Sequence, residues 1–246
     1  ERPSLLHAHF GFNGVEVREL SQRLGLPLVV SFYGVDASEF ARKPEWQRAY
    51  RSLFDTAAAV IAEGSFMRNR LIRLGCPESK VRVVHIGVPP EDYLLARNGH
   101  TGTLRVLFCG RLIEKKGLPD AIRAIKLVKQ RLAGRSVQLR VIGSGALRSS
   151  IESMICSEGL QREVLLLGAQ PHSVVLSELE QADVVLQPSR VASDGDDEGG
   201  CPTVLIEAQA CGVPVISTWH ADIPEVVRDG QTGLLVQEGN VEAMAD

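Results

Sequence analysis

The stretch EGGCPTVLIEAQACGVPVIST, residues 198 to 218, decides the fold. It joins a glycine-rich loop to a short helical segment, and a glycine stop at Gly212 then leads into the apolar run Val213 to Ile216. A loop, a helix and a buried strand in this order are typical of a parallel sheet covered by helices. The helix residues expected on the buried side are Val204, Leu205 and Ala208.

The same stretch predicts a site for an anionic ligand. Pro202 pre-sets a helical φ at a first-turn position, so backbone amides at the start of the helix are left free to point at a negative group. Gly199 and Gly200 would let that group come close. Thr203 and Glu207 are four residues apart and share one helix face, so we expect the Glu207 carboxylate to reach back along the ligand-facing side. The amides expected to face the ligand belong to Cys201, Thr203 and Val204.

A second signal for an anion lies upstream, in RVLFCGRLIEKKG at residues 105 to 117. A buried strand there runs into Gly110, and Arg111 and Lys116 follow before the next helix. Arginine offers a planar fork that suits phosphate oxygens, and lysine offers a mobile point charge. The pair would therefore neutralise about two negative charges of a diphosphate.

Composition limits the classes of function. The chain has 246 residues, 44% of them hydrophobic, which is enough for a sizeable core and one to two domains. Its 27 basic and 30 acidic residues give a net charge of −3, so nothing favours nucleic acid as a partner. The five cysteines form no CxxC pair and are interpreted as reduced thiols. Because no signal peptide or apolar run of about 18 residues is found, we expect no membrane span.

Short apolar segments alternate with longer amphipathic ones along the chain, which is the pattern of parallel sheets covered by helices. Expected strands are Leu5–His9, Leu28–Ser31, Val60–Ala62 and Val81–Val84 in the first part, and Arg105–Cys109, Gln138–Ile142, Val164–Leu167, Val184–Gln187, Val213–Ser217 and Gly233–Val236 in the second. Expected helices are Val15–Leu24, Glu45–Thr56, Ser65–Leu74, Leu118–Leu132, Leu147–Cys156, Val174–Gln181, Thr203–Ala210 and Pro224–Val227.

These elements predict two domains. Residues 1–93 are interpreted as a partial Rossmann-like domain with four strands, 94–103 as a linker, and 104–246 as a complete doubly wound domain with six strands. The chain has no initiator Met, opens almost inside a strand and ends at Asp246 in what looks like a new helix. We therefore expect a fragment that lacks its first βαβ units and its C-terminal helices.

The order of the motifs resembles a known family. GRLIEKKG, VIGSG at 141–145, LLLGAQ at 165–170, ADVVLQPS at 182–189, the stretch at 198–218 and IPEVVRDGQTGLLV at 223–236 are similar to the donor-binding half of the retaining glycosyltransferases of the GT4 family. HAHFG at 7–11, SFYGVD at 31–36 and VIAEGSFMRNRLIRLGCPESKVRVVHIGV at 60–88 resemble the acceptor-side half. The lead-in DGDDEGG and the wording EAQACG resemble enzymes of bacterial exopolysaccharide or colanic-acid assembly.

The resemblance implies an α/β protein of the GT-B fold, in which two facing Rossmann-like doubly wound domains hold a nucleotide sugar, here with the N-terminal, acceptor-side domain incomplete. It implies that Arg111 and Lys116 bind the donor diphosphate and that Glu207 binds the ribose hydroxyls. The implied catalytic residues are Glu198, Arg111 and Lys116. The implied donor-binding residues are Gly110, Arg111, Lys116, Gly199, Gly200, Cys201, Pro202, Thr203, Val204 and Glu207. The implied acceptor-side residues are His9, Tyr33 and Asp36, and no metal or other cofactor is implied.

Several positions leave two interpretations open. The family usually places seven residues between its two glutamates, whereas Glu198 and Glu207 have eight between them, so the matching position is Gly199. Glu198 is therefore either the acid that contacts the sugar or a solvated loop charge. Asp36 is either a helix cap or a substrate contact, and His9 either faces the ligand or is a core histidine.

Two further features concern side chains expected at the surface. Arg68, Arg70 and Arg73 form a basic helix face that is either solvated or meets anionic lipid head groups. His220, on the loop after a strand, is either a residue that faces the donor or, as favoured here, an exposed loop residue.

The sequence thus predicts a retaining glycosyltransferase that moves a hexose from a nucleoside diphosphate sugar to a glycan or lipid-linked glycan in cell-surface polysaccharide synthesis. The protein is expected in the cytoplasm, in peripheral contact with the inner face of the membrane. Two alternatives stay open, a nucleotide-sugar epimerase of the same fold and a catalytically silent module that binds nucleotide or glycan. Product analysis with and without a glycan acceptor separates the three.

Overall fold

The computed structural model describes residues 3–93, 102–132 and 134–246. The chain divides into two compact units, Glu1–Ile86 with Asp196–Cys201 and Gly87–Gly195 with Pro202–Asp246. It therefore leaves the second unit after Gly195 and returns to it at Pro202. The linker predicted at 94–103 lies outside the described residues, except for its last two positions.

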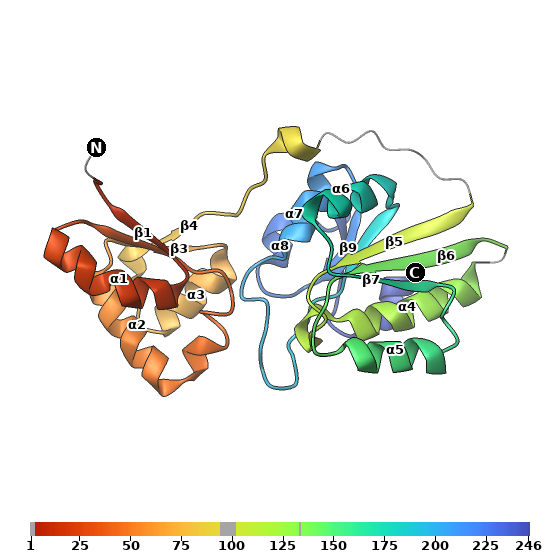
Figure 1. Cartoon of the computed structure of the whole chain (residues 1–246), viewed down its shortest axis with the longest axis horizontal. Coiled ribbons are helices and arrows are strands. Elements are labelled where there is room, and N and C mark those ends of the chain that lie inside the picture. Colours follow the sequence, from red (N-terminus) through yellow and green to blue (C-terminus); the bar gives the residue numbers. More distant parts are fainter. Residues whose placement is uncertain (1–2, 94–101, 133) are drawn as a thin grey trace. The chain divides into compact units, whose positions relative to one another are not determined.

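The first unit is a four-stranded parallel sheet with helices on one face (Figure 1). Its elements are β1 (Leu6–His9), α1 (Gly11–Leu24), β2 (Leu28–Ser31), the 3₁₀ turn η1 (Phe40–Arg42), α2 (Pro44–Thr56), β3 (Ala59–Ala62), α3 (Ser65–Arg73), the 3₁₀ turn η2 (Glu78–Lys80) and β4 (Val81–Val83). The strands stand in the order β1-β2-β3-β4, and neighbouring strands are parallel. Right-handed crossovers that all advance in one direction put α1, α2 and α3 on the same face.

The core of the first unit lies between that helix layer and the sheet. Alternate residues along the strands are buried, and Val30 and Val60 are fully covered. The middle helix α2 turns Tyr50 and Phe54 inward, and the Tyr50 ring meets the Phe32 ring edge-on at 5.3 Å between centroids. This packing holds the carboxyl ends of β1 and β2, where the predicted acceptor-side residues lie.

The second unit is a six-stranded parallel sheet with helices on both faces (Figure 1). Its strands are β5 (Thr103–Cys109), β6 (Ser136–Ile142), β7 (Val164–Gly168), β8 (Val184–Gln187), β9 (Val215–Thr218) and β10 (Gly233–Val236). Its helices are α4 (Leu118–Arg131), α5 (Arg148–Ser157), α6 (His172–Gln181), α7 (Thr203–Ala210), α8 (Ile223–Val226) and α9 (Val241–Ala245), with 3₁₀ turns η3 (Pro90–Tyr93) and η4 (Glu114–Lys116).

The strand order of this sheet is β10-β9-β8-β5-β6-β7. From β5 the chain first moves outward to β6 and β7, and then returns to add β8, β9 and β10 on the other side of β5. The helices α4 and α5 consequently cover one face, while α6, α7 and α8 cover the other (Figure 1). In open α/β sheets, ligands bind at the carboxyl ends of the strands where the order reverses, which here is between β5 and β8.

The structure confirms the predicted α/β class with two parallel sheets, and each expected strand is present to within two residues at either end. The largest difference is in α1, which begins at Gly11 instead of Val15. The Gly11 amide donates to Asp36 Oδ2 at 2.8 Å, and this contact satisfies a first-turn donor that the local sequence leaves open. Across the ranges described, no helix is both long and apolar enough to cross a membrane.

Candidate functional site

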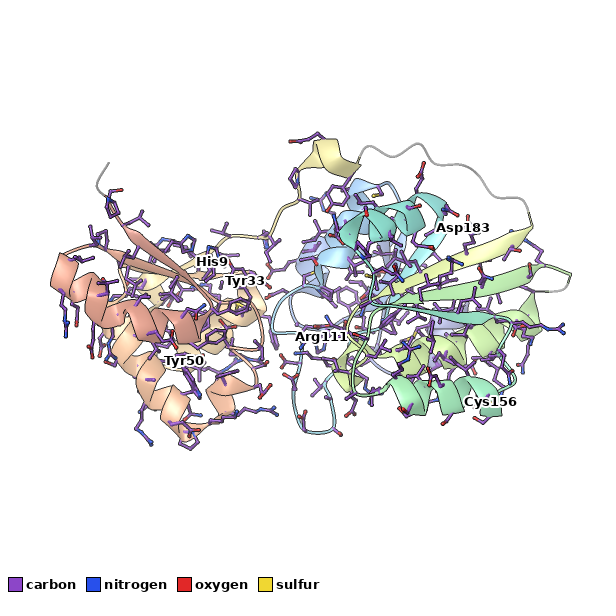
Figure 2. All side chains as sticks on the ribbon, in the orientation of Figure 1. His9, Tyr33, Tyr50, Arg111, Cys156 and Asp183 are labelled. Carbon is purple, nitrogen blue, oxygen red and sulfur yellow. The ribbon has the colours of Figure 1, made fainter. Side chains whose placement is uncertain are left out.

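The order reversal of the second sheet brings the predicted cations to one edge. β5 ends at Cys109, and Gly110, Arg111 and Lys116 follow. The Lys116 side chain folds back over Gly110, where an added Cβ would stand 3.6 Å from its Cδ. Arg111 is exposed (Figure 2), and within residues 3–93, 102–132 and 134–246 its guanidinium forms no hydrogen bond or ion pair. Two cations thus lie beside the order reversal, where a ligand is expected.

The turn that carries these cations is fastened to the loop after β8. Gly117 has a φ of 71°, and a Cβ at this position would lie 1.8 Å from the Pro188 carbonyl oxygen, so only glycine fits. The Arg190 amide donates to the Lys115 carbonyl oxygen at 2.9 Å. The place of Lys116 is therefore set by backbone contacts on both sides of it.

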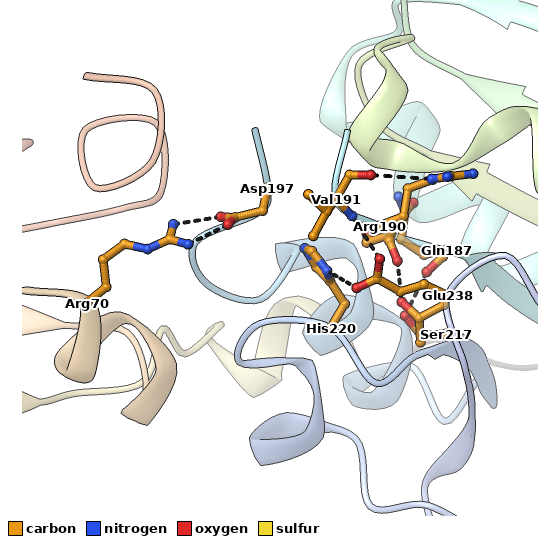
Figure 3. Close-up of polar contacts among 10 residues, drawn as sticks. Arg70, Gln187, Arg190, Val191, Asp197, Ser217, His220 and Glu238 are labelled. Carbon is orange, nitrogen blue, oxygen red and sulfur yellow. Dashed lines mark hydrogen bonds and ion pairs between the residues drawn. The ribbon is translucent and has the colours of Figure 1, made fainter. Parts of the chain in front are cut away.

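The same loop is held from its other side by β9 and by the residues after β10 (Figure 3). Ser217 Oγ donates to the Gln187 carbonyl oxygen at 2.6 Å. Glu238 Oε2 accepts the Val191 amide at 2.9 Å, and Glu238 Oε1 accepts from His220 Nδ1 at 2.7 Å. His220 is only 3% exposed, so the expectation of an exposed loop residue is wrong; the buried ring is paired with the Glu238 carboxylate, which reaches it from the surface.

The helix α7 begins at Thr203, directly after the glycine-rich loop. Pro202 is its N-cap and not a first-turn residue, because its ψ of 126° is extended, so the predicted position is wrong by one residue. The Leu205 amide bonds to the Pro202 carbonyl oxygen at 3.0 Å, whereas the amides of Thr203 and Val204 belong to the orphan donors of the first turn and remain able to face a ligand. The predicted buried side of Val204, Leu205 and Ala208 is confirmed.

The Glu207 carboxylate is held by two side chains that sequence reasoning missed. Tyr93 Oη donates to Glu207 Oε1 at 3.2 Å, and His172 Nε2 lies 3.1 Å from the same oxygen. Tyr93 is buried, and the Glu207 side chain is 13% exposed. Tyr93 lies in a stretch whose hydrophobic residues show no regular period, so no sequence pattern marked it as a site residue. His172 follows β7 at the same sheet edge as Gly110, and that placement could have identified it.

The pKa of the Cys109 thiol is affected by charged side chains around the end of β5. Burial is the main cause that raises the pKa of Cys109 to about 11; the Glu207 carboxylate adds to the rise and the Lys116 ammonium opposes it. Both charges therefore act on one half-buried sulfur. The structure thus places the Lys116 side chain beside Gly110, and Lys116 and Glu207, which are 91 residues apart in the sequence, both influence the Cys109 thiol.

The glycine-rich loop itself belongs to the first unit. Glu198 is 9% exposed, and its carbonyl oxygen would lie 2.4 Å from a Cβ at Gly34. Gly199 has a φ of 74° and also approaches Gly34, while a Cβ at Gly200 would lie 1.8 Å from Glu63 Oε2. Both glycines therefore let the chain pack closely against the first unit. The predicted donor-site residues in this segment are Glu198, Gly199, Gly200 and the half-buried Cys201.

The three predicted acceptor-side residues lie at the carboxyl ends of β1 and β2, and Figure 2 shows His9 and Tyr33 there. His9 Nδ1 is 2.5 Å from Tyr33 Oη, and His9 is exposed. Asp36 Oδ1 accepts the Tyr33 amide at 3.0 Å, and Asp36 Oδ2 accepts the Gly11 amide. Asp36 is fully buried, and burial raises its pKa although the backbone amides around it lower it. In this structure Asp36 caps and positions the backbone, while His9 is exposed and the half-buried Tyr33 is hydrogen-bonded to it.

This arrangement suits particular chemistry. The cations at the β5 end and the first amides of α7 favour phosphate oxygens, and the oriented Glu207 carboxylate suits the two hydroxyls of a ribose. Within the part of the chain that the structure describes, no group of three or more His, Cys, Asp or Glu side chains is placed to hold a metal ion.

Comparison with known proteins gives two family matches that together cover most of the chain. Residues 96–246 match the family described as glycosyl transferases group 1, and residues 1–92 match Glycosyltransferase Family 4. The amylovoran biosynthesis glycosyltransferase AmsK of Erwinia amylovora is 36% identical over 241 residues, which are 96% of this chain and 58% of AmsK. The putative colanic acid biosynthesis glycosyltransferase WcaL of Escherichia coli K12 is 34% identical over 248 residues, 99% of this chain and 60% of WcaL.

The fold also matches solved structures. HepE of Anabaena, crystallised in complex with UDP and glucose, superimposes with a TM-score of 0.81 at 20% identity, over 98% of this chain and 66% of HepE. At this identity the match establishes the shared fold. The chain spans 58% to 60% of the length of AmsK and WcaL.

Proposed function

The chain belongs to the group 1 glycosyltransferases of the GT4 family, and we propose that the full-length protein transfers a hexose from a nucleoside diphosphate sugar to a glycan or lipid-linked glycan, with retention of the anomeric configuration. One observation carries the proposal. Beside the point where the strand order reverses, the Lys116 side chain folds over Gly110 at the end of β5, and the Glu207 carboxylate is held in place by Tyr93 and His172. A site for a nucleotide sugar needs a cation to bind the diphosphate and a carboxylate to accept hydrogen bonds from the ribose diol, and both are found at the carboxyl ends of these strands.

The proposed donor contacts combine this geometry with the predicted roles of the motif residues. Arg111 and Lys116 bind the diphosphate, with Gly110 leaving room beside the Lys116 side chain. Glu207 accepts hydrogen bonds from the ribose hydroxyls, and its orientation is fixed by Tyr93 and His172. Of the loop residues, Glu198 contacts the transferred sugar. Gly199 and Gly200 are proposed to leave room for that sugar, and the segment Cys201, Pro202, Thr203 and Val204 is proposed to contact the phosphates and the sugar.

In the proposed reaction the protein mainly stabilises charge. The bond between the anomeric carbon and the donor phosphate breaks, the acceptor oxygen attacks from the same face, and the departing phosphate takes the proton of the acceptor hydroxyl. No protein nucleophile is assigned. Negative charge grows on the diphosphate as the bond breaks, so fixed donors and cations next to it lower the barrier. His9 and Tyr33 are proposed to face the acceptor.

The assembly of a cell-surface polysaccharide is the proposed setting. AmsK and WcaL, which carry amylovoran and colanic acid biosynthesis in their names, support it through their identity to this chain. We propose that the protein acts at the cytoplasmic face of a membrane. We also propose that it needs no bound metal, because Arg111 and Lys116 at the end of β5 supply positive charge for the diphosphate.

Product analysis tests the proposed function. The full-length protein is incubated with UDP-glucose or GDP-mannose, with and without a lipid-linked glycan acceptor; glycan products are identified by mass, and sugar nucleotides are identified by chromatography and proton NMR, because epimers have equal mass. We expect a glycan heavier by one hexose and free nucleoside diphosphate only when the acceptor is present. A changed sugar nucleotide without acceptor would indicate an epimerase, and binding of nucleotide with no product under any condition would indicate a silent binding module.

A further inference from the structure

The basic side chains of α3 are engaged in ways that the sequence did not suggest. Arg68 pairs with Glu78, and its side chain is 30% exposed. Arg70 instead pairs with Asp197, which lies 127 residues further along the chain. Arg70 therefore belongs neither to a solvated face nor to a face that is free for lipid head groups.

The Arg70–Asp197 pair is bidentate and largely buried. Nη1 donates to Oδ1 at 2.8 Å and Nη2 donates to Oδ2 at 2.5 Å (Figure 3). The side chains are 19% and 7% exposed, and the Phe66 ring lies 4.8 Å from the Arg70 guanidinium carbon. Two parallel charge-assisted hydrogen bonds with little solvent access define geometry far better than an exposed ion pair does.

The segment Asp196–Cys201 is fixed at other points as well. Ser38 Oγ donates to Asp196 Oδ1 at 2.8 Å. Gly199 lies against Gly34, close enough that neither position has room for a side chain. Arg70 supplies a bidentate ionic contact to this segment, and Asp197 is the direct neighbour of Glu198.

We propose that Arg70 is a positioning residue for sugar transfer: it anchors Asp197 and thereby sets the path of the glycine-rich loop at 198–200. This inference rests on the proposed function, in which that loop contacts the donor sugar. Two consecutive glycines accept many backbone paths, so the loop needs an external anchor to take one of them. The residues proposed to bind the nucleotide, Lys116 and Glu207, are held by contacts within the second unit and do not depend on Arg70.

A split between turnover and nucleotide binding tests the proposal. Arg70→Ala is compared in the full-length protein with Arg68→Ala, which removes an arginine from the same helix and breaks its pair with Glu78. We expect Arg70→Ala to lower kcat for a nucleotide sugar by about 10- to 100-fold and to leave the Kd for UDP or GDP within about threefold. The amides of residues 196–201 should exchange with solvent at least about tenfold faster, while Arg68→Ala leaves turnover and exchange at wild-type values.

A charge-swap double variant distinguishes loss of the Arg70–Asp197 ion pair from general misfolding of Arg70→Ala. Arg70→Asp combined with Asp197→Arg should recover part of the lost turnover, whereas each change alone should not. Unchanged amide exchange in Arg70→Ala, unchanged kcat, or an equal loss of nucleotide affinity would each overturn the positioning role. If the wild-type protein turns over neither UDP-glucose nor GDP-mannose, the proposed function fails, and the exchange measurement still decides whether Arg70 anchors the loop.

Discussion

The two cations after β5 are held differently. Lys116 lies folded over Gly110 in a turn that is fixed by backbone contacts, while Arg111 is exposed at the same edge. If both neutralise the donor diphosphate, Lys116→Ala and Arg111→Ala should each reduce sugar transfer by about 100-fold, which corresponds to about 2.7 kcal/mol of transition-state stabilisation. Steady-state transfer rates measure this loss.

The matched control for this pair is Arg135→Ala. Arg135 is also an exposed arginine, but it precedes β6 at the opposite edge of the same sheet. Its removal should leave transfer unchanged. Wild-type rates in both the Lys116 and the Arg111 variants would end the diphosphate assignment.

Glu207 carries a prediction about binding alone. Glu207→Gln keeps the shape of the side chain but replaces one acceptor oxygen with a donor, so hydrogen bonds from a ribose diol are weakened. We expect the Kd for UDP or GDP to rise about tenfold, or about 1.4 kcal/mol, in a calorimetric titration. Glu152→Gln, on the exposed face of α5, is the control. Nucleotide affinity that is untouched by Glu207→Gln would disprove the ribose role.

At the scale of elements, the turn after β2 depends on Gly34. Its φ is 120°, and a Cβ there would lie 2.4 Å from the Glu198 carbonyl oxygen. Gly34→Ala should therefore combine backbone strain with a collision and destabilise the fold by about 3 kcal/mol or more. Gly25→Ala is the control, since Gly25 has a φ of 64° but nothing within 4 Å of an added Cβ, and should cost only about 1–2 kcal/mol. Equal denaturation midpoints for the two variants would contradict this account of the turn.

The cap of α1 carries a prediction about pH. Burial raises the pKa of Asp36 above 3.8, so the folded protein binds its proton more tightly than the unfolded chain does. This contribution to stability is complete below the unfolded pKa and is lost as the pH rises through the raised folded pKa. The free energy of unfolding of the wild type, relative to Asp36→Asn, should therefore be larger at about pH 4 than at about pH 7 in urea titrations. A difference that grows with pH would mean that the amides of Gly11 and Tyr33 outweigh burial.

The elements were predictable from the sequence to the extent that their causes are local. The strands are apolar runs bounded by turn residues, so β5 and β8 could be placed without the structure. The start of α1 could not be predicted, because the acceptor for the Gly11 amide lies 25 residues away. The same holds for the candidate site. Arg111, Lys116 and Glu207, the residues proposed to bind the donor, lie in recognisable motifs, whereas Tyr93 and Arg70 make their contacts with partners 114 and 127 residues distant.

At the scale of the whole molecule, the two units carry different parts of the proposed reaction. The second unit holds the groups proposed for the diphosphate and the ribose, and the first unit holds His9, Tyr33 and the glycine-rich loop. We therefore expect UDP or GDP to slow amide exchange at residues 110–117 and 203–207, and to leave residues 6–33 unchanged. Protection of β1 and β2 by nucleotide alone would show that this division of roles is wrong.

The anomeric configuration of the product tests the central claim most directly. The full-length protein is given the nucleotide sugar that it turns over together with a lipid-linked glycan acceptor, and the new linkage is read by proton NMR. The account predicts that the transferred hexose keeps the configuration it had in the donor, because the acceptor attacks from the face that the diphosphate leaves and no protein nucleophile intervenes. An inverted linkage, or an altered sugar nucleotide formed in the absence of any acceptor, would contradict it.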